Sequence, residues 1–171
     1  TIPYQGYKSN RQIEFDNSDL ADIQKNFPFF LEYITPRISR NYLVKYEGES
    51  NNYSVQGVAP SHQFAEKTIM MKGRFLNEED IKNKMKYAVI GRLVQEDLFG
   101  SQNALGKYVD VGGSAYMDIG VYQDDGGDNE ERSLFVPYTT LQLVEKSNDK
   151  IGQITVAFKE QLGYAGAMAF E

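Results

Sequence analysis

The stretch YAVIGRLVQEDLFGSQNALGKYVDVGGSAYMDIGVY, residues 87–122, decides the fold class. Its apolar start, Tyr87–Ile90 before Gly91, is typical of a buried strand, and RLVQEDLF predicts a helix that ends at Gly100. A strand over 108–111, two glycines at 112 and 113, and alternating apolar residues over 117–121 then predict a β-hairpin. Strand, helix and hairpin follow one another closely, so the stretch indicates a mixed fold.

Upstream of this stretch, four further elements are predicted, and the first is a short strand around Ile13 and Phe15. NSDLADIQKNFP predicts a helix that is capped at Asn17 or Ser18 and stops before Pro28. Alternation over residues 42–58, interrupted by the polar EGESNN, predicts a hairpin. Asn77 is expected to cap a short helix through NEEDIKNK.

Downstream, the sequence predicts a strand, a helix and a last strand. The first strand runs from Leu134 to Val136 and meets Pro137, the helix is capped at Thr139 or Thr140, and the last strand covers 154–158. Because strands and helices mix along the whole chain, we expect an α+β fold with interleaved α/β elements.

Composition excludes several classes of protein. The chain has 171 residues, 41% of them hydrophobic, with a formal net charge of −6 and no cysteine. An acidic chain is a poor partner for nucleic acid, and thiol chemistry and Cys-ligated zinc are excluded. No stretch approaches the roughly 18 apolar residues of a membrane span. We therefore expect either a cytosolic protein or a fragment whose targeting and anchoring segments lie outside it.

Candidate catalytic and phosphate-binding residues fail on spacing. GSQNALGK, from Gly100 to Lys107, has one residue too many between its glycines for a phosphate loop, and Tyr108 stands where Ser or Thr is needed. The single histidine, His62, follows Ser61, but adjacency does not supply a catalytic geometry. We predict a surface or capping histidine.

Acidic clusters are the remaining candidates for chemistry. DDGGDNEE, residues 124–131, departs from the EF-hand pattern because Gly126 occupies a ligand position, so a solvated hairpin loop is expected, and cation binding stays open. Glu78, Glu79 and Asp80 fit the start of a helix. We predict no catalytic residue, metal site or cofactor, hence a non-enzymatic domain with a binding or mechanical role.

The run from Ile69 to Tyr122 resembles the extracytoplasmic core domain of MacB-type ABC transporter permeases. The segments NSDLADIQKNFP, VQGVAP and SLFVPYTTLQLV extend the resemblance to nearly the whole chain, and the chain departs from the family pattern at Asp118 and Ile119. The family-motif residues, which the resemblance implies to be structural, are Gly73, Arg74, Phe75, Asp80, Gly91, Leu98, Phe99, Gly100, Gly106, Lys107 and Pro137.

The resemblance implies a two-lobed α/β structure. Residues 1–59 and 131–171 would form a porter-like β-α-β lobe, and residues 60–130 an inserted, smaller Sabre-like lobe. In the family this domain lies on the periplasmic side of the cytoplasmic membrane, between the first and second transmembrane helices. Asn10 and Phe158 are then expected at the same end of the structure.

The implied function is mechanical. The domain would couple ATP hydrolysis in a separate cytoplasmic domain or subunit to export or extraction of a substrate across the cell envelope. Its expected partners are the permease transmembrane helices and that ATPase; the resemblance also allows for a homodimer and a periplasmic adaptor protein. The alternative is a periplasmic ligand- or glycan-binding module, suggested by the 12 tyrosines and the acidic loop. A hydrolase would need His62 or an acid pair to line a cleft.

Overall fold

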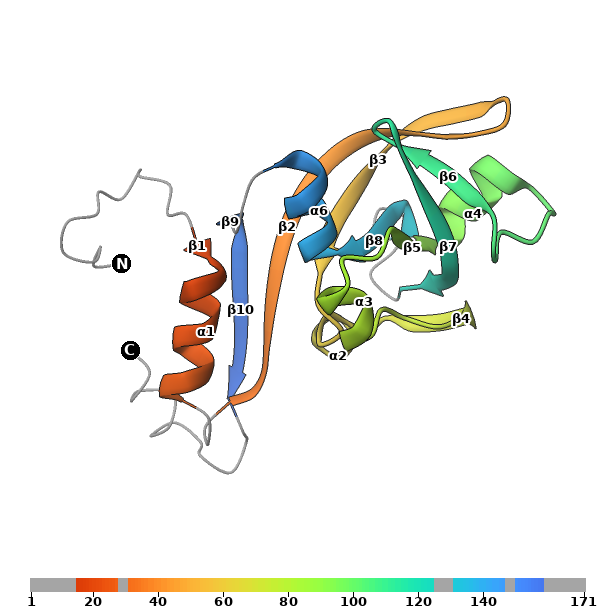
Figure 1. Cartoon of the computed structure of the whole chain (residues 1–171). Helices are drawn as coiled ribbons and strands as arrows, with labels where there is room; N and C mark the ends of the chain where they lie inside the picture. The colour runs from red at the N-terminus through yellow and green to blue at the C-terminus, as the bar shows by residue number, and fades with distance from the viewer. Residues whose placement is uncertain (1–14, 28–30, 125–130, 147–149, 159–171) are drawn as a thin grey trace, which may run out of the picture.

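A computed structural model describes residues 15–27, 31–124, 131–146 and 150–158, with helices and strands mixed along the chain (Figure 1). The strands are β1 (Phe15–Asp16), β2 (Leu31–Tyr46), β3 (Glu49–Val58), β4 (Ile69–Gly73), β5 (Tyr87–Gly91), β6 (Tyr108–Val111), β7 (Ser114–Gln123), β8 (Ser133–Pro137), β9 (Lys150–Ile151) and β10 (Gln153–Phe158). The helices are α1 (Asn17–Asn26), α2 (His62–Ala65), α3 (Glu78–Lys82), α4 (Arg92–Phe99) and α6 (Tyr138–Glu145). The predicted α+β class is confirmed.

An eight-stranded sheet organises the described residues. Its order is β10-β2-β3-β8-β5-β7-β4, and β6 pairs with both β2 and β7. The β3–β8 and β5–β7 pairs are parallel and the other pairs are antiparallel, while β1 and β9 form a separate short pair. The sheet runs through both predicted lobes without a break, and the division near residues 60 and 130 stays a prediction.

Two apolar clusters lie on opposite faces of the sheet. Because side chains alternate along a strand, Leu134 and Val136 on β8 belong to one cluster and Phe135 to the other. The first, larger cluster is formed with residues of α1, α3, α4 and α6. The second contains Val58, Phe75, Leu76, Val89, Tyr122 and Phe135. This second face carries the cavity described below.

The first helix and the first hairpin form as predicted, but two details were wrong. Helix α1 is capped by Asp16, not by Asn17 or Ser18, because the Asp16 carboxylate accepts the Asp19 N–H and Asp19 caps the Asp16 N–H in return. The hairpin turns at residues 47–48 alone, and β3 begins at Glu49 within the EGESNN segment. Strand β2 extends upstream of the predicted hairpin to Leu31, where it pairs with β10.

Helix α6 begins earlier than predicted, and its two threonines are not caps. Pro137 is the cap residue, and Thr139 and Thr140 lie inside the helix, where they are buried. Their hydroxyls donate to the carbonyls of Ile81 and Met85 at 2.6 and 2.7 Å. The threonines therefore fasten α6 to the end of α3, a contact that a local pattern does not reveal.

The other predicted helices and strands are confirmed, and three short elements were missed. The predicted hairpin around the acidic loop was wrong, because β5 lies between β7 and β8 in the sheet. Asn77 caps α3, β5 is buried, α4 ends at Gly100 with φ +60°, and β6 and β7 form the expected hairpin. No prediction covered α2, β4 or β9, which are four, five and two residues long. Asn10 lies outside the described residues, so its predicted proximity to Phe158 is not tested.

Gly91 is expected to tolerate no side chain. A Cβ atom there would lie 2.0 Å from the carbonyl oxygen of Glu131, so Gly91→Ala must push the backbone apart. We expect a loss of about 1–3 kcal/mol or more in the free energy of unfolding, measured by urea denaturation. Gly48→Ala is the matched control because nothing lies within 4 Å of its Cβ position. An equal effect of the two substitutions would contradict the close approach.

Candidate functional site

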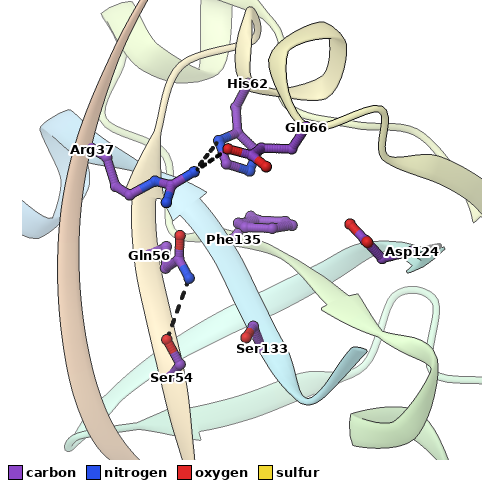
Figure 2. Close-up of a pocket in the computed structure, with 8 residues that line it drawn as sticks. All are labelled: Arg37, Ser54, Gln56, His62, Glu66, Asp124, Ser133 and Phe135. Atoms are coloured by element: carbon purple, nitrogen blue, oxygen red, sulfur yellow. Dashed lines mark hydrogen bonds and ion pairs between the residues drawn. The ribbon is translucent and has the colours of Figure 1, made fainter. Parts of the chain in front are cut away.

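A cavity of about 300 Å³ opens on the second face of the sheet (Figure 2). Neighbouring strands place its lining side by side, because the β3–β8 register sets Ser54 opposite Ser133 and Gln56 opposite Phe135. The cavity is lined by Arg37 from β2, Ser54 and Gln56 from β3, His62 and Glu66 from α2 and the residue after it, Asp124 after β7, and Ser133 and Phe135 from β8. Seven of these eight lining side chains are polar, and Phe135 is the exception.

The predicted exposure of His62 was wrong. The side chain is 1% exposed, at the first residue of α2, and its ring lies 4.6 Å from the ring of Phe135. Nδ1 faces the Arg37 guanidinium at 3.4 Å. Burial, and then the positive charge of Arg37, lower the pKa of His62 to about 3. The imidazole is therefore neutral at physiological pH.

Ser61 and His62 do not form a nucleophile and base. The Ser61 hydroxyl donates to the Ile34 carbonyl at 2.8 Å and contacts the Thr35 hydroxyl. The Arg37 guanidinium also binds the Glu66 carboxylate at 2.9 Å, so a cation, and no carboxylate, holds Nδ1 of His62. This is the reverse of the arrangement that orients a catalytic histidine.

Arg74 and Asp80, two of the family-motif residues, form an ion pair. The Arg74 guanidinium donates to both Asp80 carboxylate oxygens, at 2.7 and 3.2 Å, and Asp80 also accepts the Asn77 N–H at the start of α3. These hydrogen bonds raise the pKa of Arg74. Asp80 is buried, whereas Glu78 and Glu79 are exposed. The three acids therefore do not converge on one site.

Asp80→Ala is expected to destabilise the domain by about 3 kcal/mol, because it removes a buried carboxylate that both pairs with Arg74 and caps α3. The measurement is the free energy of unfolding in urea. Glu79→Ala, on the exposed side of the same helix, is the control and should change stability by less than about 0.5 kcal/mol. A similar small effect for Asp80→Ala would mean that the ion pair adds nothing.

The acidic loop is described only at its two ends. Glu131 is buried and accepts hydrogen bonds from Arg92 at 2.8 Å and from the Asp124 N–H at 3.2 Å. The Arg92 bond holds the pKa of Glu131 below its usual range. Residues 125–130 lie outside the described residues, and the described part holds no group of acids or histidine suited to a metal ion. Cation binding by this loop stays untested.

The other motif residues lie at the ends of helices and strands, in a turn or in the apolar clusters. Gly100 ends α4, and the N–H of Gly106 donates to the Asp118 carbonyl at 2.8 Å in the turn before β6, where Lys107 is exposed. The segment is therefore a helix end and a turn, as the spacing indicated. The remaining positions are at bends or in the core: Gly73 at the end of β4, Phe75 in the second cluster, Leu98 and Phe99 in the first, and Pro137 before α6.

Sequence reasoning missed the cavity residues Arg37 and Gln56, and it missed the environment of Asp118. Asp118 is fully buried in β7, and its Oδ1 accepts the Gly120 N–H at 3.1 Å. Burial raises the pKa of Asp118 to about 7. The only signal in the sequence was that a carboxylate stands where the family has an apolar residue.

A family model described as the MacB-like periplasmic core domain matches residues 2–168. This chain belongs to that family. The resemblance drawn from the motifs is thereby confirmed, and so is its assignment to a periplasmic domain of MacB-like permeases. No helix in the described ranges combines the length and the apolar composition needed to cross a bilayer.

Curated relatives are export proteins much longer than this chain. The macrolide export ATP-binding/permease protein MacB of Vibrio parahaemolyticus is 26% identical over 163 residues, which cover 92% of this chain and 25% of that protein. The probable syringafactin export ATP-binding/permease protein SyfD of Pseudomonas syringae is 24% identical over 164 residues, covering 93% and 25%. The chain thus spans about a quarter of the length of these relatives.

Two solved structures share the fold of this MacB-like periplasmic core domain. The periplasmic region of MacB from Actinobacillus actinomycetemcomitans superposes with a TM-score of 0.83 at 22% identity, over 95% of this chain and 73% of that one. The extracellular domain of the transporter YknZ from Gram-positive bacteria gives 0.77 at 18% identity, over 90% and 78%. At these identities the likeness establishes the fold.

Proposed function

We propose that this domain is a mechanical element of an ABC transporter permease. It lies on the outer side of the cytoplasmic membrane, between the first and second transmembrane helices. There it passes movement driven by cytoplasmic ATP hydrolysis to a substrate that is exported or extracted across the cell envelope. The step is a rigid-body displacement and needs no reactive side chain in the domain.

The observation that carries the proposal is the path of β2. Its first half pairs with β10 and its second half with β3 and β6, so this single strand of 16 residues connects the β10 edge to the β2–β3 hairpin. At about 3.3 Å per residue its contour is about 50 Å long. The described chain begins in β1, which leads directly into α1, and it ends in β10. Helix α1 and β10 both lie at this edge (Figure 1). Movement applied there reaches the far hairpin through one continuous strand.

The proposed mechanical role also implies a division into two lobes and a set of partners. Residues 1–59 and 131–171 form the porter-like lobe and residues 60–130 the inserted lobe. The partners are the permease transmembrane helices and an ATPase domain or subunit, with a second copy of the permease and a periplasmic adaptor as further candidates. The names of the relatives, which combine ATP binding with a permease, support an ATPase partner.

Thiol labelling in the intact permease tests the placement of the domain. The chain has no cysteine of its own, and Ser50 is exposed near the tip of the β2–β3 hairpin. In a cysteine-free permease, Ser50→Cys should react with a membrane-impermeant maleimide in intact spheroplasts. A cysteine in the ATPase domain is the control and should react only after lysis. Labelling of Ser50→Cys that also requires lysis would refute the periplasmic placement.

A further inference from the structure

Unsatisfied polar atoms gather at the cavity on the second sheet face. Within the described residues, six buried side-chain polar atoms have no hydrogen-bond partner, and three of them belong to residues that line this cavity. They are Nε of Arg37, Oε1 of Gln56 and Nε2 of His62. Buried polar groups nearly always have a partner, so such a concentration points to a molecule that enters between these side chains.

To satisfy these three atoms, a ligand must both donate and accept hydrogen bonds. Arg37 Nε carries a hydrogen and can only donate. Because the Arg37 guanidinium also donates to Nδ1 of the neutral His62, the imidazole proton is on Nε2, which is a second donor. Gln56 Oε1 is an acceptor. A hydroxyl group accepts from the first two and donates to the third, whereas a bare carboxylate or phosphate oxygen only accepts.

The charges around the cavity argue against an anion. The positive charge of Arg37 is matched by the Glu66 carboxylate at 2.9 Å, and His62 is neutral. Asp124 adds a negative charge on the side of Phe135 opposite Arg37 (Figure 2). The remaining polar lining, Ser54 and Ser133, is uncharged. Such a lining favours a neutral ligand with several hydroxyl groups.

We propose that this cavity binds a small neutral, hydroxylated ligand of the size of a single sugar ring. Its volume of about 300 Å³ lies at the lower end of the range for ligand pockets, which fits one ring and not an oligomer. Gln56 and Ser54 on β3 face one edge of the ligand, and Ser133 faces it from β8. The site adds a binding function to the mechanical role and does not depend on it.

The test is a titration of the 15N-labelled chain of 171 residues with glucose and N-acetylglucosamine, followed by two-dimensional NMR. Glycerol, sodium phosphate and glycine are the comparison ligands. We expect saturable shifts of the backbone amides of Gln56, His62 and Ser133 with at least one of the sugars. Gln56→Leu removes the acceptor and should weaken the affinity for that sugar about tenfold. Asn52→Leu, an exposed position on the same strand, should leave the affinity unchanged.

Each comparison ligand can overturn the proposal. The absence of saturable shifts with either sugar would mean that ordered water alone satisfies the three atoms. Tighter binding of phosphate or of glycine than of the sugars would make this a site for charged ligands. Glycerol that binds as tightly as the sugars would contradict a ring-sized ligand. Equal weakening by Gln56→Leu and Asn52→Leu, with both variants folded in the NMR spectrum, would place the binding elsewhere.

Discussion

Asp118→Asn is expected to stabilise the domain by up to about 4 kcal/mol at pH 8 and to leave its stability unchanged at pH 4. The reason is the cost of ionising a buried carboxyl group. Asp118 is fully buried in β7, one oxygen accepts the Gly120 N–H, and the other has no partner within the described residues. Lys72 is the one charged group that offsets part of this cost.

The direction in which stability changes with pH follows from the pKa values of Asp118 in the unfolded and folded states. Burial raises the folded-state pKa from 3.8 to about 7, so between these values the folded state holds a proton that the unfolded state has lost. Stability from this group is complete below about pH 4 and falls as pH rises to 7. Asparagine has the same shape but cannot ionise, so the variant escapes the loss.

Urea unfolding of the two proteins at intervals from pH 4 to pH 8 checks this expectation. All other ionisable groups are shared, so the difference between the two curves isolates Asp118. Asp22→Asn, which changes an exposed carboxylate on α1, is the control. A difference between Asp118→Asn and the parent that stays constant with pH would show that Asp118 does not change its charge in the folded state.

As pH falls from 7 to 4, the free energy of unfolding of His62→Phe is expected to rise by about 3 kcal/mol relative to that of the parent. Burial and the charge of Arg37 lower the pKa of His62 from 6.5 to about 3. Between these values the unfolded chain binds a proton that the folded protein refuses. The stability contribution of His62 is therefore complete above about pH 6.5 and is lost as pH falls toward 3.

The same unfolding experiment measures the effect of His62→Phe. Phenylalanine keeps a ring against Phe135 and Phe75 but loses the Arg37 contact, a cost that is the same at every pH and cancels in the comparison. Between about pH 4 and 6.5, Asp118 lowers the free energy of unfolding as pH rises, whereas His62 raises it. The stability of the parent should therefore change little with pH in this range. Each variant should show the pH dependence of the group that it retains. Parallel curves for the parent and His62→Phe would disprove a buried neutral histidine.

The strands that form the core could be predicted because their signal is local. Apolar runs bounded by glycine identified β5, and the alternation around Gly112 and Gly113 identified the β6–β7 hairpin. The first half of β2 gave a weaker signal because it contains Pro36, which lacks an N–H and is unfavourable inside a sheet. There the antiparallel pairing with β10, a contact between distant segments, stabilises an extended conformation that the local sequence does not favour.

The cavity could not be predicted because it depends on the order of the strands. Arg37, Gln56, His62 and Phe135 come from four separate elements, and the parallel β3–β8 pair brings two of them together. Their sequence neighbours carry no ligand-binding motif. His62 was predicted to be a surface or capping residue, because its position next to Ser61 supplies no catalytic geometry. It is instead buried against the aromatic rings of Phe75 and Phe135.

Distances between spin labels on the reconstituted, full-length permease, measured by double electron–electron resonance, test the mechanical role most directly. One spin-label pair would join Ser50→Cys to a cysteine in a transmembrane helix, and a second pair would join Ser50→Cys to Asp22→Cys within the domain. We expect the first distance to change between the nucleotide-free and ATP-trapped states and the second to stay the same, as for a rigid body. An unchanged first distance in a permease that still hydrolyses ATP would contradict mechanical coupling through this domain.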